Sequence, residues 1–186
     1  MSESDQDSIQ IAGIEQICAD LQVEPTDPVM LLIAWRMRAG TMCVFTREEW
    51  TRGLVEMGCD SMEGLKASFD EQWEELQDKD LFRDYYSFCF NFAKEPGYGV
   101  RTLPIEVALQ MWQLTLHERL AHFKEWTEFL ELKQVKAITK DVWDMLLTFA
   151  NDVDVDMSNY DDDGGARRPP PLWPLRGRPA CAIPVP

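Results

Sequence analysis

Apolar residues recur every three or four positions through most of the chain up to residue 163, which is the spacing of one helix face. The first such run covers residues 11–21, and we expect Ser8 to cap this helix. The next run, residues 28–39, is apolar on almost every side and therefore predicts a buried helix. Either Thr26 or Asp27 can cap it.

The same pattern continues toward the C-terminal end. Thr46 and Glu49 have the spacing of a capping box, and residues 65–76 place leucine and aromatic side chains on one stripe. Thr139 can cap a last amphipathic helix. A short extended piece, residues 40–45, is the main exception, so the sequence predicts an all-α fold of about eight helices.

Composition favours a folded, acidic protein. The 186 residues are 45% hydrophobic, and the formal net charge is -15. Residues 164–186 contribute four arginines and no acid, so the remainder carries a net charge of -19. Such a surface repels phosphates, which argues against nucleic acid as a partner.

Other features of the sequence indicate an intracellular protein. The chain begins without a basic and apolar leader, and no apolar run reaches the length of a membrane span. The five cysteines are odd in number, and most have apolar neighbours. This pattern predicts reduced core thiols rather than disulfides.

No catalytic or metal-binding constellation is recognisable. The only two histidines, His117 and His122, are five positions apart, which places them about 140° apart on a helix. They are therefore not expected to share a metal. We expect no catalytic residue, no metal and no cofactor.

Calcium is the one metal that the acidic stretch suggests. Residues 152–163 place aspartates at several ligand positions of an EF-hand loop, but Met157 stands where the sharp turn needs glycine. A second register that begins at Asn159 ends on Pro170, which supplies no carboxylate. An EF-hand-like turn without metal is the preferred interpretation, and a calcium-binding protein is the alternative.

Residues 165–186 have a different character. Seven of the eleven prolines follow residue 168, and Arg168, Pro171 and Pro174 fit the R-x-x-P-x-x-P pattern of SH3 ligands. The alternative is a tail without a partner. Arg/Pro-rich composition predicts that this segment does not pack.

Several separate motifs resemble one known family. They read "DPVMLLIAWRMRAGTMCVFTREEW", "MGCDSMEGLKASF", "FNFAKEPG", "TKDVWDMLLTFA" and "DMSNYDDDG". Together they resemble the potentiating-neddylation (PONY, or DCUN) domain of the defective-in-cullin-neddylation proteins, over residues 8–164. The resemblance implies an all-α domain of two EF-hand-like halves that bind no calcium, and the composition of residues 165–186 predicts a disordered tail after it.

The resemblance also implies a function. Members of the family are non-catalytic scaffold ligases for cullin neddylation. One surface holds the acetylated N-terminal methionine of the neddylation conjugating enzyme, and another holds the winged-helix C-terminal domain of a cullin. We expect a monomer in the nucleus and cytoplasm, with no nucleic-acid or membrane partner.

Residues of the N-acetyl-methionine pocket are carried over from the family by motif. They are Ile11, Ile14, Pro25, Met30, Leu31, Ile33, Met42, Phe45, Phe92, Met111 and Leu114. Family members often have glutamine at the position of Met42 and an aromatic residue at that of Met111. Both methionines make the expected pocket more flexible and more apolar.

Asp141 of "TKDVW" matches the first acid of the family's cullin-binding patch. After Gly164 the family pattern stops, and the terminal strand and helix that supply a second aspartate have no counterpart. Arg167 and Arg168 stand near the lost position instead. The alternative function is therefore a non-productive isoform that binds the conjugating enzyme but not cullin.

Overall fold

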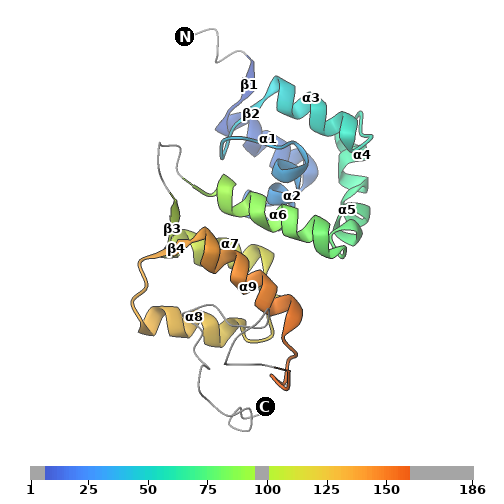
Figure 1. The fold of residues 1–186 in the computed structure, drawn as a ribbon. Helices are drawn as coiled ribbons and strands as arrows, with labels where there is room; N and C mark the ends of the chain where they lie inside the picture. The colour runs from blue at the N-terminus through green and yellow to red at the C-terminus, as the bar shows by residue number, and fades with distance from the viewer. Residues whose placement is uncertain (1–6, 95–100, 160–186) are drawn as a thin grey trace. The chain divides into compact units, whose positions relative to one another are not determined.

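The computed structural model describes residues 7–94 and 101–159, which fall into two compact units, Met1–Pro96 and Gly97–Pro186 (Figure 1). The described residues form nine helices and four short strands, which confirms the all-α prediction. The elements of the first unit are β1 (Ser8–Ile9), α1 (Ile11–Leu21), α2 (Pro28–Arg36), β2 (Phe45–Thr46), α3 (Arg47–Glu56), α4 (Met62–Ala67), α5 (Phe69–Glu75) and α6 (Lys79–Phe92). Those of the second are β3 (Thr102–Pro104), α7 (Ile105–Thr115), α8 (Phe123–Leu132), β4 (Ala137–Thr139) and α9 (Lys140–Asp152). The predicted tail lies outside the described residues.

Helix starts follow the predicted caps with one exception. Of the two candidates for α2, Asp27 is the cap, since its carboxylate accepts a hydrogen bond from the N–H of Val29 at 2.9 Å. Thr46 and Glu49 form the complete capping box of α3, and Thr139 caps α9. The prediction for Ser8 was wrong, because this residue pairs with Thr46 in a ribbon and the backbone turns into α1 at Gln10.

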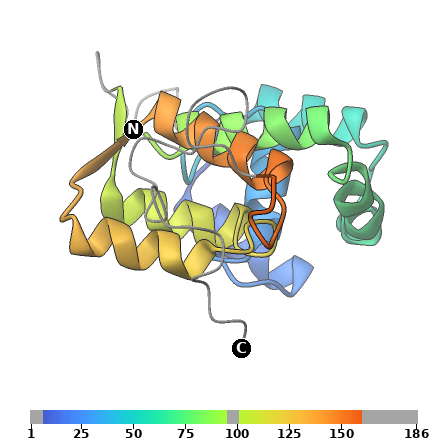
Figure 2. The ribbon, with the colours of Figure 1, turned by 60° about the horizontal axis from the view of Figure 1, so that its bottom comes forward.

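Each unit contains one two-stranded antiparallel ribbon. Ile9 pairs with Phe45 in the first, and Leu103 pairs with Ile138 in the second. The strands β2, β3 and β4 run without a break into helices, as the views of the second ribbon in Figures 1 and 2 show. This repeated arrangement fixes where α3, α7 and α9 begin.

Metal ligands are scarce at these ribbons. The loops before β2 and β4, residues 37–44 and 133–136, contain no aspartate or glutamate. Across residues 7–94 and 101–159, no group of three or more His, Cys, Asp or Glu side chains is placed to hold a metal ion.

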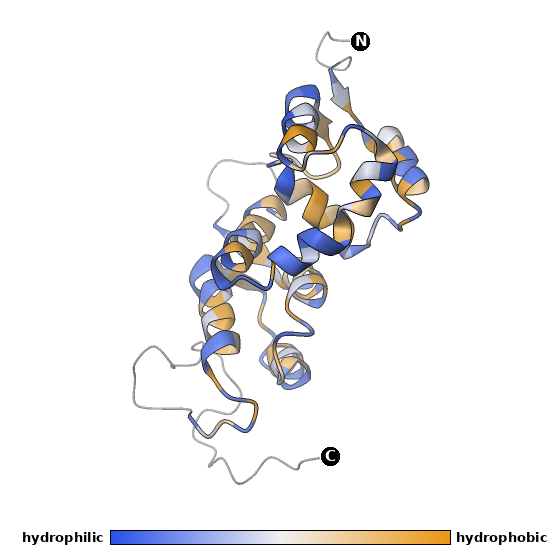
Figure 3. Cartoon of the chain, turned by 90° about the vertical axis from the view of Figure 1, so that its right-hand side faces the viewer, coloured by the Kyte–Doolittle hydropathy of each residue, from blue (hydrophilic) through white to orange (hydrophobic). Residues whose placement is uncertain are grey.

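The core of the first unit is built from amphipathic helices, whose colours in Figure 3 alternate between hydrophobic and hydrophilic around each turn. Leu21, Ile33, Met37 and Leu65 are buried in it. A Cβ atom added at Gly53 on α3 would lie 2.4 Å from the Cγ atom and 2.9 Å from the Cα atom of Met37. Glycine at this position therefore allows α3 to approach the end of α2.

Three fully buried tryptophans form the centre of the second unit. Trp112 of α7 stacks on Trp143 of α9, with ring centroids 5.2 Å apart. Trp126 of α8 meets Trp112 edge to face at 5.8 Å. Such aromatic contacts add about 0.5–1.5 kcal/mol per pair beyond the burial of the rings, so they hold the three helices together.

None of the helices described in the structure is long and apolar enough to cross a membrane.

The approach of α3 to Met37 yields a stability prediction. Gly53→Ala forces a methyl group into the backbone of residue 37, so we expect the free energy of unfolding to fall by about 1–3 kcal/mol. Gly40→Ala is the matched control, because its nearest neighbour would lie at an ordinary 3.5 Å. Urea denaturation of both variants measures the difference, and equal stability of the two would contradict this account of Gly53.

Candidate functional site

One hydrophobic cluster of the first unit brings together five of the predicted pocket residues. Ile33 and Phe45 are buried in its centre. Ile14, Met30 and Phe92 pack against that centre while remaining half-buried. These residues come from α1, α2, β2 and α6, so only the folded unit assembles them.

Two further predicted pocket residues, Ile11 and Met42, are exposed on the surface of the first unit. The ribbon pairs Ile9 with Phe45, which brings the start of α1 close to the segment before β2. Ile11, at the start of α1, is 63% exposed, and Met42, in the segment before β2, is 41% exposed. Both side chains are therefore accessible to a binding partner.

The remaining predicted pocket residues differ in their surroundings. Pro25 is exposed in the turn between α1 and α2, and Leu31 is buried on α2. Within the described part of the chain, neither is grouped with the cluster. Met111 is buried and Leu114 is half-buried on α7, which belongs to the second unit rather than to the unit that contains the cluster.

A sulfur contact beneath the cluster was not predicted. The thiol of Cys18 on α1 donates to the Sδ atom of Met30 at 3.7 Å. Burial, followed by the negative charge of Glu24, raises the pKa of the Cys18 thiol, which favours the protonated form that can donate. The sequence marked Cys18 as a core thiol but gave no sign of its partner.

The other described cysteines divide by exposure. Cys89 is fully buried, and burial raises its pKa to about 12, so the thiol stays protonated and unreactive. Cys43, in contrast, is exposed beside Met42, so the prediction of core thiols was wrong at this position.

A groove with a volume of about 510 Å³ runs along one face of α6, and sequence reasoning missed it. Leu81, Phe88 and Phe92 line it from α6, and Trp35 and Ala39 line it from the end of α2. Leu81 and the two phenylalanines recur at helical spacing, so this wall could be predicted from the sequence. The opposite wall could not, because Trp35 and Ala39 are far from α6 along the chain. Phe92 belongs to both the groove and the pocket cluster.

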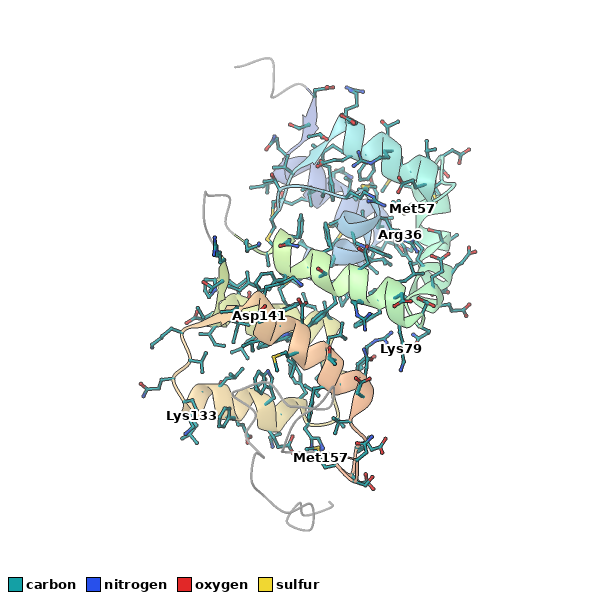
Figure 4. The ribbon with its side chains drawn as sticks, viewed as in Figure 1. Arg36, Met57, Lys79, Lys133, Asp141 and Met157 are labelled. Atoms are coloured by element: carbon teal, nitrogen blue, oxygen red, sulfur yellow. The ribbon has the colours of Figure 1, made fainter. Side chains whose placement is uncertain are left out.

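Asp141, the predicted acid of the second surface, is exposed in the first turn of α9 (Figure 4). Thr139 accepts a hydrogen bond from the N–H of Val142 at 3.3 Å and so fixes the start of this helix. An ion pair between Lys140 and Asp144 joins this turn to the next one. A carboxylate here is favoured by the helix dipole and is accessible to a cation from another molecule.

The acidic loop after α9 is closed by a carboxamide. The Oδ1 atom of Asn159 accepts from the N–H of Asp154 at 2.9 Å, and its Nδ2 atom donates to the carbonyl of Asp152 at 3.0 Å. Met157 has a φ of 59° and turns its side chain into the interior. Both EF-hand registers considered above extend beyond the described residues.

The two histidines lie in the turns between α7 and α8 rather than on one helix, so the 140° argument does not apply to them, and their surroundings differ. His117 meets Phe123 edge to face, with ring centroids 5.4 Å apart. The Nε2 atom of His122 lies 2.9 Å from the carbonyl oxygen of Val155, so this ring links the start of α8 to the acidic loop.

Known proteins resemble the chain over most of its length. A protein-family model described as cullin binding matches residues 64–169. DCN1-like protein 5 of Rattus norvegicus is 35% identical over 163 residues, which cover 88% of this chain and 65% of that protein. DCN1-like protein 3 of Xenopus tropicalis is 35% identical over 161 residues, covering 85% and 53% respectively. The chain thus spans between 53% and 65% of the length of these relatives.

The carboxamide clasp predicts a local loss of stability. Asn159→Ala removes both hydrogen bonds, each of which contributes about 0.5–1.5 kcal/mol, so we expect the acidic loop to open. Faster hydrogen exchange at the amide of Asp154 measures this opening. Ser158→Ala is the control, since its hydroxyl bonds to the side chains of Asp154 and Asp156 and both bonds of Asn159 to the backbone remain. Unchanged exchange in the Asn159 variant would show that the clasp does not hold the loop.

Proposed function

Because this chain belongs to the cullin-binding family, we propose that it acts in cullin neddylation as a non-catalytic scaffold. It binds the acetylated conjugating enzyme with one surface and the winged-helix domain of a cullin with another. The observation that carries the proposal is the family match over residues 64–169, a span that includes the exposed Asp141.

Proximity explains how such a scaffold accelerates transfer without a catalytic side chain. Holding both partners converts a bimolecular attack of the cullin lysine into a nearly intramolecular one. The gain depends on the effective concentration of one partner near the other. The protein then acts as a monomer in the nucleus and cytoplasm, and needs no cofactor, nucleic acid or membrane.

The conjugating enzyme binds at the hydrophobic cluster of the first unit. Half-buried Ile14, Met30 and Phe92 offer apolar contacts, and exposed Ile11 and Met42 add contact area at the surface. An acetylated terminus suits this surface, because a free ammonium group would lose its hydration against the apolar side chains.

The cullin binds at the start of α9. Asp141 presents its carboxylate to solvent in the first turn, where it can pair with a lysine or arginine of the winged-helix domain. The net charge of -15 adds attraction at a distance and speeds association with a basic surface.

A second candidate function is a competitor that binds the conjugating enzyme but not cullin. The observation that favours it is compositional: residues 164–186 contain four arginines and no acid, whereas the resemblance implies a second aspartate there. Arginines in place of that second acid would weaken the attraction for a basic cullin surface. Measuring the two binding reactions separately distinguishes the scaffold from the competitor.

For the first surface, we expect calorimetry to show that an acetylated N-terminal peptide of the conjugating enzyme binds and that the free-amine peptide binds at least tenfold more weakly, about 1.4 kcal/mol. Ile11→Asp should abolish the preference, because it places a charge at the exposed end of the pocket. Val55→Asp is the matched control, since Val55 is 74% exposed on α3 and outside the pocket. Equal binding of both peptides would contradict the assignment of this surface.

For the second surface, charge reversal tests the role of Asp141. Asp141→Lys should weaken binding of a cullin winged-helix domain by about tenfold or more, because a pairing carboxylate becomes a repelling ammonium. Binding of the acetylated peptide should be unchanged in this variant. Cullin binding that survives the reversal at full strength would rule out Asp141, and peptide binding without any cullin binding by the native chain would favour the competitor.

A further inference from the structure

The first two turns of α9 contain three charged side chains, Lys140, Asp141 and Asp144. The ammonium of Lys140 forms an ion pair with the Oδ1 atom of Asp144, one helical turn further on. The side chain of Lys140 is 33% exposed and that of Asp144 is 51% exposed. Asp141 stands between them in sequence and faces solvent.

A lysine at this position is unusual on electrostatic grounds. The N-terminal turn of a helix carries partial positive charge, so a cation is disfavoured there and a carboxylate is favoured. An ion pair with the lysine on the N-terminal side is also the weaker order at this spacing. Asp144 therefore compensates a charge that the helix end does not favour.

Spacing connects this pair to the proposed cullin-binding surface. Asp141 and Asp144 are three positions apart, and such residues are neighbours on a helix, with Cβ atoms about 5–6 Å apart. Lys140 directly precedes Asp141 in the chain, and charges closer than the Debye length, about 8 Å at physiological salt, are only partly screened from each other. Without Asp144, that ammonium would cancel much of the field of Asp141 and repel an approaching cation.

We infer that Asp144 is a positioning residue for this surface: by binding Lys140 it keeps the ammonium from masking Asp141. The inference rests on the proposed function and adds a residue that sets the affinity for a basic partner. The three side chains together carry a charge of −1. Because Lys140 and Asp144 neutralise each other, this negative charge is located at Asp141. Asp144 acts through Lys140 and does not itself touch the partner.

A thermodynamic cycle tests this mechanism. The native chain, Lys140→Gln, Asp144→Asn and the double variant are titrated with one cullin winged-helix domain at low and at physiological salt. Asp144→Asn should weaken binding by about fivefold to tenfold, and the loss should shrink at the higher salt. Lys140→Gln should bind at least as tightly as the native chain.

The double variant shows whether Asp144 acts through Lys140 or contacts the cullin itself, because it removes Lys140 together with Asp144. Affinity within about twofold of the native chain is expected if Asp144 acts only through Lys140. A double variant as weak as Asp144→Asn would mean that Asp144 contacts the cullin directly, and it would overturn the inference. A native-like affinity of Asp144→Asn alone would overturn it as well.

Glu128→Gln is the matched control. It breaks another pair of the same spacing in the same unit, between Lys124 and Glu128 on α8, and changes the net charge by the same amount. Its affinity should stay within about twofold of the native value. A loss as large as that of Asp144→Asn would show that overall charge, rather than the position of Lys140, is responsible.

Crystal structures of the native chain and of Asp144→Asn test the inference without any partner. The Nζ atom of Lys140 should move toward the carboxylate of Asp141 when Asp144 loses its charge. An unmoved Lys140 would overturn the inference even if cullin binds. Failure of the native chain to bind cullin, with Lys140 moving as expected, would instead reject the proposed function of the surface alone.

Discussion

The antiparallel pairing of Ile9 with Phe45 is the contact on which the candidate pocket depends. It joins the start of α1 to the segment that leads into α3, two parts of the chain that no local signal connects. Once paired, the exposed Ile11 and Met42 lie at the margins of a core that contains Ile33 and Phe45. The ribbon is only two residues long, so packing of the surrounding helices must supply most of its stability.

In the second unit, a short ribbon and the helices packed beside it likewise position a charged site. The ribbon of β3 and β4 determines where α9 begins, and the stack of Trp112 on Trp143 holds that helix against α7. Asp141 is therefore presented from a rigid element rather than from a loop. Its neighbours Lys140 and Asp144 pair with each other, and the Asp141 side chain is exposed to solvent.

Sequence predicted best those features that depend on adjacent residues. The caps at Asp27, Thr46 and Thr139 need only a side chain and the next turn of backbone, and all three are present. The predicted extended piece at residues 40–45 reaches only the first residue of β2, and the pairings and the other strands were missed because strands of two or three residues have no measurable period of their own. Ser8 failed as a cap for the same reason, since its partner Thr46 lies far away along the chain.

The site was predicted only in part. The helical stripes could not show which apolar residues remain accessible, so the pocket residues came from family resemblance rather than from periodicity. The groove along α6 has one wall from a single helix and another from distant residues such as Trp35 and Ala39. The pair of Lys140 with Asp144 has a visible i, i+4 spacing, and it could have been found by counting charges along α9.

Single-turnover transfer of the ubiquitin-like modifier tests the scaffold account most directly. The loaded conjugating enzyme is mixed with a cullin, or with free lysine, in the presence and absence of this protein. The account predicts faster transfer to the cullin lysine and an unchanged rate with free lysine, because proximity helps only an acceptor that the protein also binds. Equal acceleration of both reactions would contradict it, since the protein would then be changing the chemistry of the conjugating enzyme itself.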